Sequence, residues 1–171
     1  MFRLDLRALD RVGRVSVEGV LEPDHPLWAG VHFALAEPLE VSFTATPGGQ
    51  DQVMVQGRLR GKMAGECRRC LEPTTSEFDL GVDWYFIPPD ELSEEGEDSE
   101  VRFLDPTALE LDLEPLIREE MVLSVPRFQE CRTDCRGLCP RCGTNLNLES
   151  CECREDTEDP RWDVLRALPT D

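Results

Sequence analysis

Eight cysteines, arranged in four close pairs, are the residues of this 171-residue chain whose types and spacing could support chemistry. Zn²⁺ binds four thiolates in a tetrahedron, and a tight Cys-x₂-Cys turn presents two of them at a time. Eight thiols would therefore supply two structural zinc sites. The candidate ligands are Cys67, Cys70, Cys131, Cys135, Cys139, Cys142, Cys151 and Cys153.

Four of these cysteines lie close enough in the sequence to form a site by themselves. Cys139-Pro140-Arg141-Cys142 is a knuckle, and Gly143 is free to adopt the positive φ that the turn after a second ligand often needs. Cys151 and Cys153 follow after a short interval. The spacing therefore predicts a Cys₄ site over residues 139–153.

The remaining two pairs are far apart in the sequence. Cys67 and Cys70 lie where we expect the tip of a hairpin, and Cys131 and Cys135 follow about sixty residues later. By elimination these four form the other site, which would join the sheet to the segment after the helix and lower the entropy of the intervening loop. Rival groupings place Cys135 with the Cys139–Cys142 knuckle, and leave Cys131 free or let it replace a member of the last pair.

Charge and composition limit the classes of function. The chain has a net charge of −18 and a sequence pI near 4.4, whereas nucleic-acid binding relies on Lys and Arg. Such acidity favours basic partners. The first residues lack the apolar stretch of a secretion signal, and no run approaches the ~20 apolar residues of a membrane span. We therefore expect a cytoplasmic protein with no membrane partner, whose reduced thiols hold metal.

Catalytic patterns are missing from the sequence. All-thiolate zinc sites are typically closed and structural, whereas a catalytic zinc keeps a position for water. His25, between Asp24 and Pro26, is typical of a turn, and His32 is typical of an exposed strand position. No phosphate loop, dinucleotide fingerprint or serine nucleophile with a matched base occurs. The sequence thus predicts neither an enzyme nor a small-molecule substrate.

The elements that must position the cysteines are mostly strands. Apolar residues alternate with polar ones around 15–17, 31–35, 41–45, 53–63 and 78–86, and a Pro47-Gly48-Gly49 turn separates two of these runs. Period-two alternation is typical of half-buried antiparallel strands. We predict an α+β fold with an antiparallel β-rich body, as a sheet or partly closed barrel, one or two packed helices and a C-terminal zinc-knuckle segment.

The chain divides into two parts near residue 126. The β-rich body spans 1–126, with an acidic loop over 88–100 and a helix over about 112–124. The cysteine-rich zinc-binding segment spans 127–171 and ends in a short helix opened by Asp159-Pro160, with Trp162, Leu165 and Leu168 on its apolar side.

The helix over 112–124 has recognisable ends and an apolar stripe. Asp112 is the expected N-cap, and Pro115 is tolerated in the first turn. The helix must end before Pro126. Its expected apolar residues are Leu113, Ile117 and Met121, joined by Leu116 and Leu123.

The cations form two groups that could contact RNA or a protein partner. Arg58, Arg60 and Lys62 share one face of a strand, where a salt ladder to Glu77 and Asp79 on the next strand is the simpler expectation. The second group lies between or beside cysteines, where guanidinium groups could contact phosphate or offset the charge of a Zn(Cys)₄ centre. This group is Arg68, Arg69, Arg132, Arg136 and Arg141.

Four blocks of the sequence resemble the YceD family of large ribosomal RNA subunit accumulation proteins. They are CRRCL at 67–71 between two strands, LDLEPLIREEMVLSVP at 111–126, GLCPRCGTNLN at 137–147 and DPRWDVLRAL at 159–168. The resemblance implies a cytoplasmic, non-enzymatic ribosome biogenesis factor needed for accumulation of large-subunit (23S) ribosomal RNA. Members of the family differ in how much of the C-terminal cysteine cluster they carry, which implies that the second site is an optional stabiliser.

Three mechanisms remain open. Net charge favours a zinc-stabilised adaptor that binds a basic ribosomal protein or maturation factor. The arginines beside the knuckles favour a module that binds ribosomal RNA directly. A weaker alternative is a thiol redox switch, with a reversible disulfide between Cys67 and Cys70.

Overall fold

The computed structural model describes residues 2–49, 51–89 and 101–153. Most of the predicted acidic loop lies outside the described residues, and so does the predicted C-terminal helix with Trp162, Leu165 and Leu168. The elements in chain order are β1 (Arg3–Asp5), α1 (Leu6–Val12), β2 (Val15–Leu21), the 3₁₀ turn η1 (Pro26–Trp28), β3 (Ala34–Leu35), β4 (Leu39–Gly49), β5 (Gln52–Glu66), β6 (Pro73–Ile87), β7 (Val101–Phe103), β8 (Glu110–Asp112) and α2 (Glu114–Ser124).

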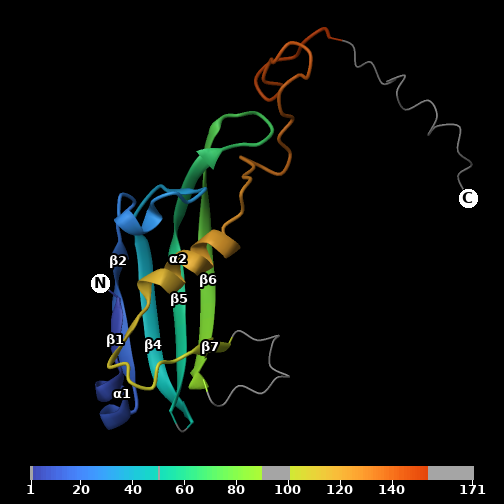
Figure 1. The fold of residues 1–171 in the computed structure, drawn as a ribbon. Coiled ribbons are helices and arrows are strands. Elements are labelled where there is room, and N and C mark those ends of the chain that lie inside the picture. The colour runs from blue at the N-terminus through green and yellow to red at the C-terminus, as the bar shows by residue number, and fades with distance from the viewer. Residues whose placement is uncertain (1, 50, 90–100, 154–171) are drawn as a thin grey trace, which may run out of the picture.

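An open sheet forms the body of the described chain. Its strands follow the order β2-β4-β5-β6-β7, and the short β3 also pairs with β5. Neighbours are antiparallel apart from β6 and β7, which pair in parallel. β1 and β8 form a separate two-stranded sheet. Figure 1 shows the long strands β4, β5 and β6 side by side, with α2 lying across one face. The predicted α+β class is confirmed, in its open-sheet form.

Alternation along the strands decides which face of this sheet is buried. On β5 one set of alternate residues is buried: Val53, Val55, Leu59 and Met63. Arg58 and Arg60 on the other set are exposed, because successive side chains of a strand point to opposite faces. On the buried face the rings of Phe43 and Trp84 stack, with their centroids 4.9 Å apart. The period-two pattern therefore identified the core face correctly.

Two predictions were wrong at strand ends. The predicted turn at Pro47-Gly48-Gly49 belongs to β4, in which Pro47 lies opposite Val53 and a register shift follows. The chain reverses later, near Asp51, whose φ is 57°. The predicted strand over 31–35 is reduced to Ala34–Leu35, because the residues before it form a bend that packs against the core edge.

Helix α2 covers the buried face of the sheet. Leu113, Ile117 and Met121 are fully buried, as the stripe predicted, but Leu123 is 74% exposed and does not belong to the apolar face. The helix starts at Glu114, two residues later than predicted, and ends at Ser124, before Pro126; its N-cap is Leu113, so the predicted N-cap at Asp112 was wrong. Asp112 still supports its start, because its Oδ1 accepts a hydrogen bond from the N–H of Glu114 at 3.0 Å.

A short N-terminal helix was not located by the sequence patterns. Asp5 caps α1, since its Oδ1 accepts from the N–H of Ala8 at 2.9 Å, and Gly13 ends the helix with a φ of 72°. Leu6 and Leu9 are buried against the core. Seven residues are too few for a clear apolar period, which explains the omission. Among the described residues, no helix is long and apolar enough to cross a bilayer.

Candidate metal centres

The first cysteine pair lies at the tip of the β5–β6 hairpin. β5 ends at Glu66 and β6 begins at Pro73, so Cys67 and Cys70 occupy the turn between them. The N–H of Leu71 donates to the carbonyl of Cys67 at 2.8 Å, which closes the turn around both thiols. In Figure 1 this tip extends beyond the rest of the sheet, toward the cysteine-rich segment. The predicted hairpin position of this pair is confirmed.

The second knuckle repeats the backbone conformation of the first. The N–H of Gly143 donates to the carbonyl of Cys139 at 2.9 Å, as the N–H of Leu71 does to Cys67. Gly143 has a φ of 74°, as the sequence predicted, and Leu71 has a φ of 59°. Positive φ is uncommon for a leucine, because its Cβ then crowds the backbone. Both turns therefore have the same backbone geometry. Gly143 is the residue type favoured at this positive φ, whereas Leu71 adopts it against its conformational preference.

Cys67, Cys70, Cys131 and Cys135 come together as one cluster. Their Sγ atoms all lie within 4.8 Å of one another. The Sγ atoms of Cys67 and Cys135 are 3.8 Å apart, and those of Cys70 and Cys131 are 3.7 Å apart. Four thiolates at the usual Zn–S distance in a tetrahedron would lie about 3.8 Å from each other. The thiols of this first cluster are therefore spaced to hold a tetrahedral metal ion.

Cys139, Cys142, Cys151 and Cys153 form the second cluster. Their Sγ atoms also lie within 4.8 Å of one another. The two clusters differ in exposure, because three cysteines of the first are buried, whereas only Cys139 is buried in the second. This grouping is the one expected by elimination, and the rival that places Cys135 with the Cys139–Cys142 knuckle does not match it. That the eight thiols bind metal stays a prediction.

The pKa values within each cluster diverge. A hydrogen bond from the backbone of Cys131 lowers the pKa of the Cys67 thiol to about 6, and desolvation raises the pKa of Cys131 to about 12. In the second cluster, the Thr144 hydroxyl lowers the pKa of Cys142 to about 6, and hydrogen bonding with Cys142 raises that of Cys153 to about 12. A divalent cation would favour the thiolate at every position, since metal ligation requires deprotonated sulfur.

Backbone hydrogen bonds join the hairpin tip to the segment after α2. The N–H of Arg68 donates to the carbonyl of Gln129 at 2.8 Å, and the N–H of Leu138 donates to the carbonyl of Arg69 at 2.9 Å. Gly137 has a φ of 76°, and a Cβ there would lie 3.0 Å from the carbonyl oxygen of Arg69. The residue at position 137 must therefore lack a side chain and adopt the left-handed backbone conformation for the two segments to approach this closely.

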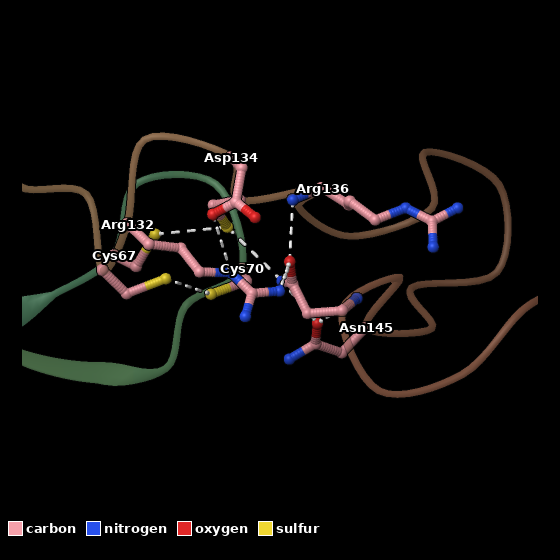
Figure 2. A network of polar contacts seen from close by, with 9 residues as sticks. Cys67, Cys70, Arg132, Asp134, Arg136 and Asn145 are labelled. Carbon is pink, nitrogen blue, oxygen red and sulfur yellow. Dashed lines mark hydrogen bonds and ion pairs between the residues drawn. The ribbon is translucent and has the colours of Figure 1, made fainter.

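Asn147 is a site residue that the sequence patterns missed. Its Nδ2 donates to the Sγ of Cys135 at 3.4 Å, and its Oδ1 accepts from the N–H of Arg136 at 2.8 Å. Figure 2 shows Arg136 and Asn145 on the same side of the first cluster as Cys70. A second asparagine, Asn145, accepts from the N–H of Asn147 at 3.0 Å. The sequence signal that could have identified Asn147 is the presence of asparagines between two ligand pairs, because this residue type often hydrogen-bonds to the backbone in tight turns.

The cations of the sheet form the salt ladder that was the simpler expectation. Arg58 and Arg60 lie 3.4 and 3.2 Å from the carboxylate of Asp79. Lys62 lies 3.5 Å from Glu77 and 3.4 Å from Glu37, which raises the pKa of its ammonium group. All of these groups are exposed, so the pairs contribute little to stability. Their charges are nevertheless balanced by neighbouring carboxylates.

The arginines beside the cysteines differ in their partners. Arg68 lies 2.5 Å from Glu130, and Arg132 lies 3.3 Å from Asp134. Arg141 interacts with other groups of the chain. The exposed side chains of Arg69 and Arg136 form no ion pair with any described residue. These two guanidinium groups are therefore the ones best placed to meet an external anion.

The histidines lie away from both clusters. His25 is a turn residue, as predicted, and its Nδ1 accepts from the N–H of Leu27 at 3.2 Å at the start of η1. His32 is exposed, in a bend rather than the predicted strand, and its Nε2 lies 3.5 Å from the carbonyl of Val125. Neither ring belongs to the clusters of metal-binding side chains found in the described residues.

Comparison with known proteins now identifies the family. The model of the large ribosomal RNA subunit accumulation protein YceD matches residues 55–169, a range that includes all eight cysteines. This chain belongs to the YceD family. The match begins within β5 and extends through the hairpin tip, α2 and both clusters. The YceD family region of this protein is therefore the part that contains the candidate metal centres.

Curated relatives of this YceD family member include proteins of two Mycobacterium species and of Arabidopsis thaliana. An uncharacterized protein of Mycobacterium tuberculosis is 38% identical over 115 residues, which are 66% of this chain and 54% of the relative. An uncharacterized protein of Mycobacterium leprae is 31% identical over 117 residues, or 67% of this chain and 52% of the relative. The chain spans about half the length of these relatives.

The plant relative has a descriptive name. It is the large ribosomal RNA subunit accumulation protein YCED homolog 1, chloroplastic, of Arabidopsis thaliana, which is 32% identical over 63 residues, or 37% of this chain and 20% of the relative. No solved structure matches this chain. The family and its named connection to large ribosomal RNA therefore rest on sequence similarity, and the geometry of the clusters rests on the structure.

Proposed function

We propose that this protein is a non-catalytic, cytoplasmic ribosome biogenesis factor that supports accumulation of large-subunit (23S) ribosomal RNA. The observation that carries this proposal is the YceD family match over residues 55–169. The plant relative is named for the same accumulation of large ribosomal RNA. Within the proposal, the protein acts as an adaptor that binds a basic ribosomal protein or a maturation factor, so its effect on the RNA is indirect.

Zinc at both clusters is part of this proposal. Four thiolates in a tetrahedral arrangement suit Zn²⁺, which has no redox chemistry of its own. The separations of 3.7 and 3.8 Å in the first cluster support this choice. A four-thiolate shell leaves no position for water or substrate, which supports a structural role and not a catalytic one. The proposed ligands are Cys67, Cys70, Cys131 and Cys135 in one site and Cys139, Cys142, Cys151 and Cys153 in the other.

Charge supports the adaptor over direct binding of RNA. The whole chain has a net charge of −18, which would repel phosphate and attract a basic protein. Arg58 and Arg60 share the carboxylate of Asp79, and Arg68 is paired with Glu130, so their charges are partly compensated. Ribosomal proteins that bind RNA are strongly basic, and an acidic surface can bind them before they meet their RNA site.

A deletion experiment tests the function itself. Removing the gene from its host should lower the ratio of 23S to 16S ribosomal RNA, and the full chain should restore it. A Cys67→Ser variant, which loses one proposed ligand at the hairpin tip, should restore the ratio less well. An unchanged ratio in the deletion strain, at normal and at low temperature, would contradict the proposal.

A binding experiment tests the adaptor mechanism. The purified chain should bind one or a few purified large-subunit ribosomal proteins, with an affinity that falls as salt rises from 50 to 200 mM in roughly the manner of ion-pair interfaces. Binding to protein-free 23S RNA should be weak under the same conditions. The reverse result, tight RNA binding and no protein binding, would reject the adaptor.

Arg69 and Arg136 support a second candidate, direct binding of ribosomal RNA. Their guanidinium groups are exposed and form no ion pair with a described residue. If RNA binds here, replacing both by Ala should weaken binding and make the salt dependence shallower. The matched control replaces Arg58 and Arg60 by Ala, which removes the same charge from residues paired with Asp79. Equal losses in the two variants would indicate a non-specific charge effect.

Metal analysis separates zinc from the thiol redox alternative. We expect two zinc ions per chain, and one in each of the variants Cys67→Ser and Cys139→Ser, which affect different clusters. A redox switch predicts instead a reversible disulfide between Cys67 and Cys70 and little bound metal. One zinc ion throughout, lost only with Cys139→Ser, would show that the hairpin-tip pair is not a ligand pair.

A further inference from the structure

One loop of the second cluster contacts the first cluster; we call it the asparagine loop and define it as residues 143–150. It joins Cys142 to Cys151, so both of its ends are held by the second cluster. Its own structure is a turn, in which the carbonyl of Asn145 accepts from the N–H groups of Leu148 and Glu149, both at 3.0 Å. A metal ion bound by the second cluster would therefore fix the ends of this loop.

The middle of the asparagine loop contacts the first cluster. Asn147 donates from Nδ2 to the Sγ of Cys135 at 3.4 Å, and its Oδ1 accepts from the N–H of Arg136 and from Arg132, both at 2.8 Å. Figure 2 shows Arg132, Arg136 and Asn145 of this network near Cys67 and Cys70. A hydrogen bond from an amide to a ligand sulfur orients the thiolate and stabilises its charge.

Further contacts fix the loop against the hairpin tip. Asn145 donates from Nδ2 to the carboxylate of Glu72 at 3.1 Å, and it accepts from the Nδ2 of Asn147 at 2.9 Å. The N–H of Leu146 donates to the carbonyl of Gly137 at 2.9 Å. The position of the Asn147 amide thus depends on a loop whose ends belong to the second cluster.

We propose that the two metal centres are energetically coupled, and that Asn147 is the positioning residue that links them. Metal binding at the second cluster holds the asparagine loop in place, so that Asn147 supports Cys135 and raises the metal affinity of the first cluster. By thermodynamic linkage, metal at the first cluster raises the affinity of the second by the same factor. This inference rests on the metal sites proposed above.

The size of the coupling follows from known outer-shell effects. Removing a residue that hydrogen-bonds to a ligand typically lowers metal affinity by about 10- to 100-fold. Asn147 makes one such bond through a neutral amide, so we expect a factor of about ten. The first cluster should then lose this factor whenever the loop is released, without any change to its own four ligands.

Cobalt titration tests the coupling directly. Co²⁺ would replace zinc in the full chain, and its absorption bands from thiolate ligands would report binding in competition with a chelator. The double variant Cys151→Ser/Cys153→Ser reports the first site alone, and Cys67→Ser/Cys70→Ser reports the second. With coupling, the product of the two binding constants of the unmodified chain exceeds the product from these single-site variants about tenfold.

Substituting Asn147 tests whether it is the link. In an Asn147→Leu background, which keeps the side-chain volume and removes the amide, the tenfold excess should fall to about one, and the isolated first site should be unchanged. The matched control is Glu149→Gln in the same loop, because the Glu149 side chain is exposed and forms no hydrogen bond or ion pair with a described residue. This control should keep the full excess.

Each outcome supports or overturns a separate claim. Two bound cobalt ions with no excess in the unmodified chain would overturn the coupling while leaving the metal sites intact. An excess that persists in Asn147→Leu would overturn the role of Asn147. A chain that binds no cobalt would overturn the proposed metal sites and the coupling together, whereas the 23S-to-16S ratio of the deletion strain tests the proposed ribosomal function separately.

Discussion

The sheet body and the cysteine end of this protein are held together in different ways. The body buries a continuous apolar cluster that includes Trp84, Phe43 and Ile117. The cysteine end buries a small cluster of Cys67, Cys70 and Cys135, against which only Leu138 packs among the described residues. Apolar burial stabilises the body by roughly 25 cal/mol per Å², whereas the cysteine end has too little apolar surface for this to suffice.

This difference predicts how each region responds to the removal of metal. The body should keep its fold in the absence of metal, because side-chain packing and a long sheet stabilise it. The cysteine end is joined by backbone hydrogen bonds between the hairpin tip and the later segment, such as those of Arg68 and Leu138, and we expect it to depend on the proposed thiol coordination as well. We therefore expect a cysteine end whose structure depends on metal, attached to a sheet body whose fold does not.

Metal removal should have the largest effect. A structural zinc site contributes on the order of 10 kcal/mol to folding of its segment, so a strong chelator should unfold residues 131–153 and spare the sheet. Amide hydrogen exchange measures this difference: protection of Leu138 and Leu146 should be lost, and protection within β5 should remain. Equal loss of protection in both regions would show that the body also depends on the metal.

Trp84→Ala should have the next largest effect, and only on the body. The side chain is 2% exposed, stacks on Phe43 and donates to Glu120 at 2.9 Å. Its removal should lower the free energy of unfolding by about 3–5 kcal/mol in urea denaturation followed by circular dichroism. The metal content per chain should not change. Phe103→Ala is the control, because Phe103 is 61% exposed and its loss should cost less than about 0.5 kcal/mol.

Two glycines of the sheet offer a smaller and sharper test of packing in the body. A Cβ on Gly57 would overlap the ring of Phe43 and lie 2.6 Å from the carbonyl oxygen of Ser42, so Gly57→Ala should cost about 1–3 kcal/mol. A Cβ on Gly81, the strand partner of Arg58, would meet no atom within 4 Å. Gly81→Ala should therefore be close to neutral in thermal denaturation, and similar losses for both would refute the packing argument.

Leu71→Gly should have the smallest effect, and it should appear only at the cysteine end. Leu71 has a φ of 59° and is 57% exposed, so glycine would relieve backbone strain while losing little packing. The net gain of about 0.5–1 kcal/mol should raise the zinc affinity of the first cluster about two- to fivefold. Leu71→Ala keeps the strain and is the control. A weaker zinc affinity in Leu71→Gly would show that the leucine side chain itself supports the turn.

Local patterns in the sequence predicted the elements and the turns that carry the cysteines. Alternation over 53–63 identified the buried face of β5, and the stripe of Leu113, Ile117 and Met121 identified the buried face of α2. The tight knuckle at Cys139–Cys142 predicted a positive φ at Gly143. These features depend on neighbours within a few residues, so the sequence contains the information directly.

The same local patterns gave wrong or missing predictions where contacts between distant residues determine the structure. Leu123 was assigned to the apolar stripe of α2, but its side chain is exposed and is no part of the core formed by the described residues. The turn after β4 was misplaced because pairing with β5 continues through Pro47, which local turn preference cannot reveal. Helix α1 is stabilised by burial of Leu6 and Leu9 against the core, which is a contact with residues distant in the sequence.

The eight cysteines show most clearly what the sequence determined and what only the tertiary structure decided. Residue type and spacing determined that two knuckles exist and that eight thiols suffice for two four-ligand sites. The sequence could offer the partition only by elimination, because Cys67 and Cys135 meet across 68 positions of the chain. Only the fold brought the hairpin tip, the segment after α2 and Asn147 together. Their approach depends on hydrogen bonds between distant segments, and no local pattern in either segment indicates that the two will pair.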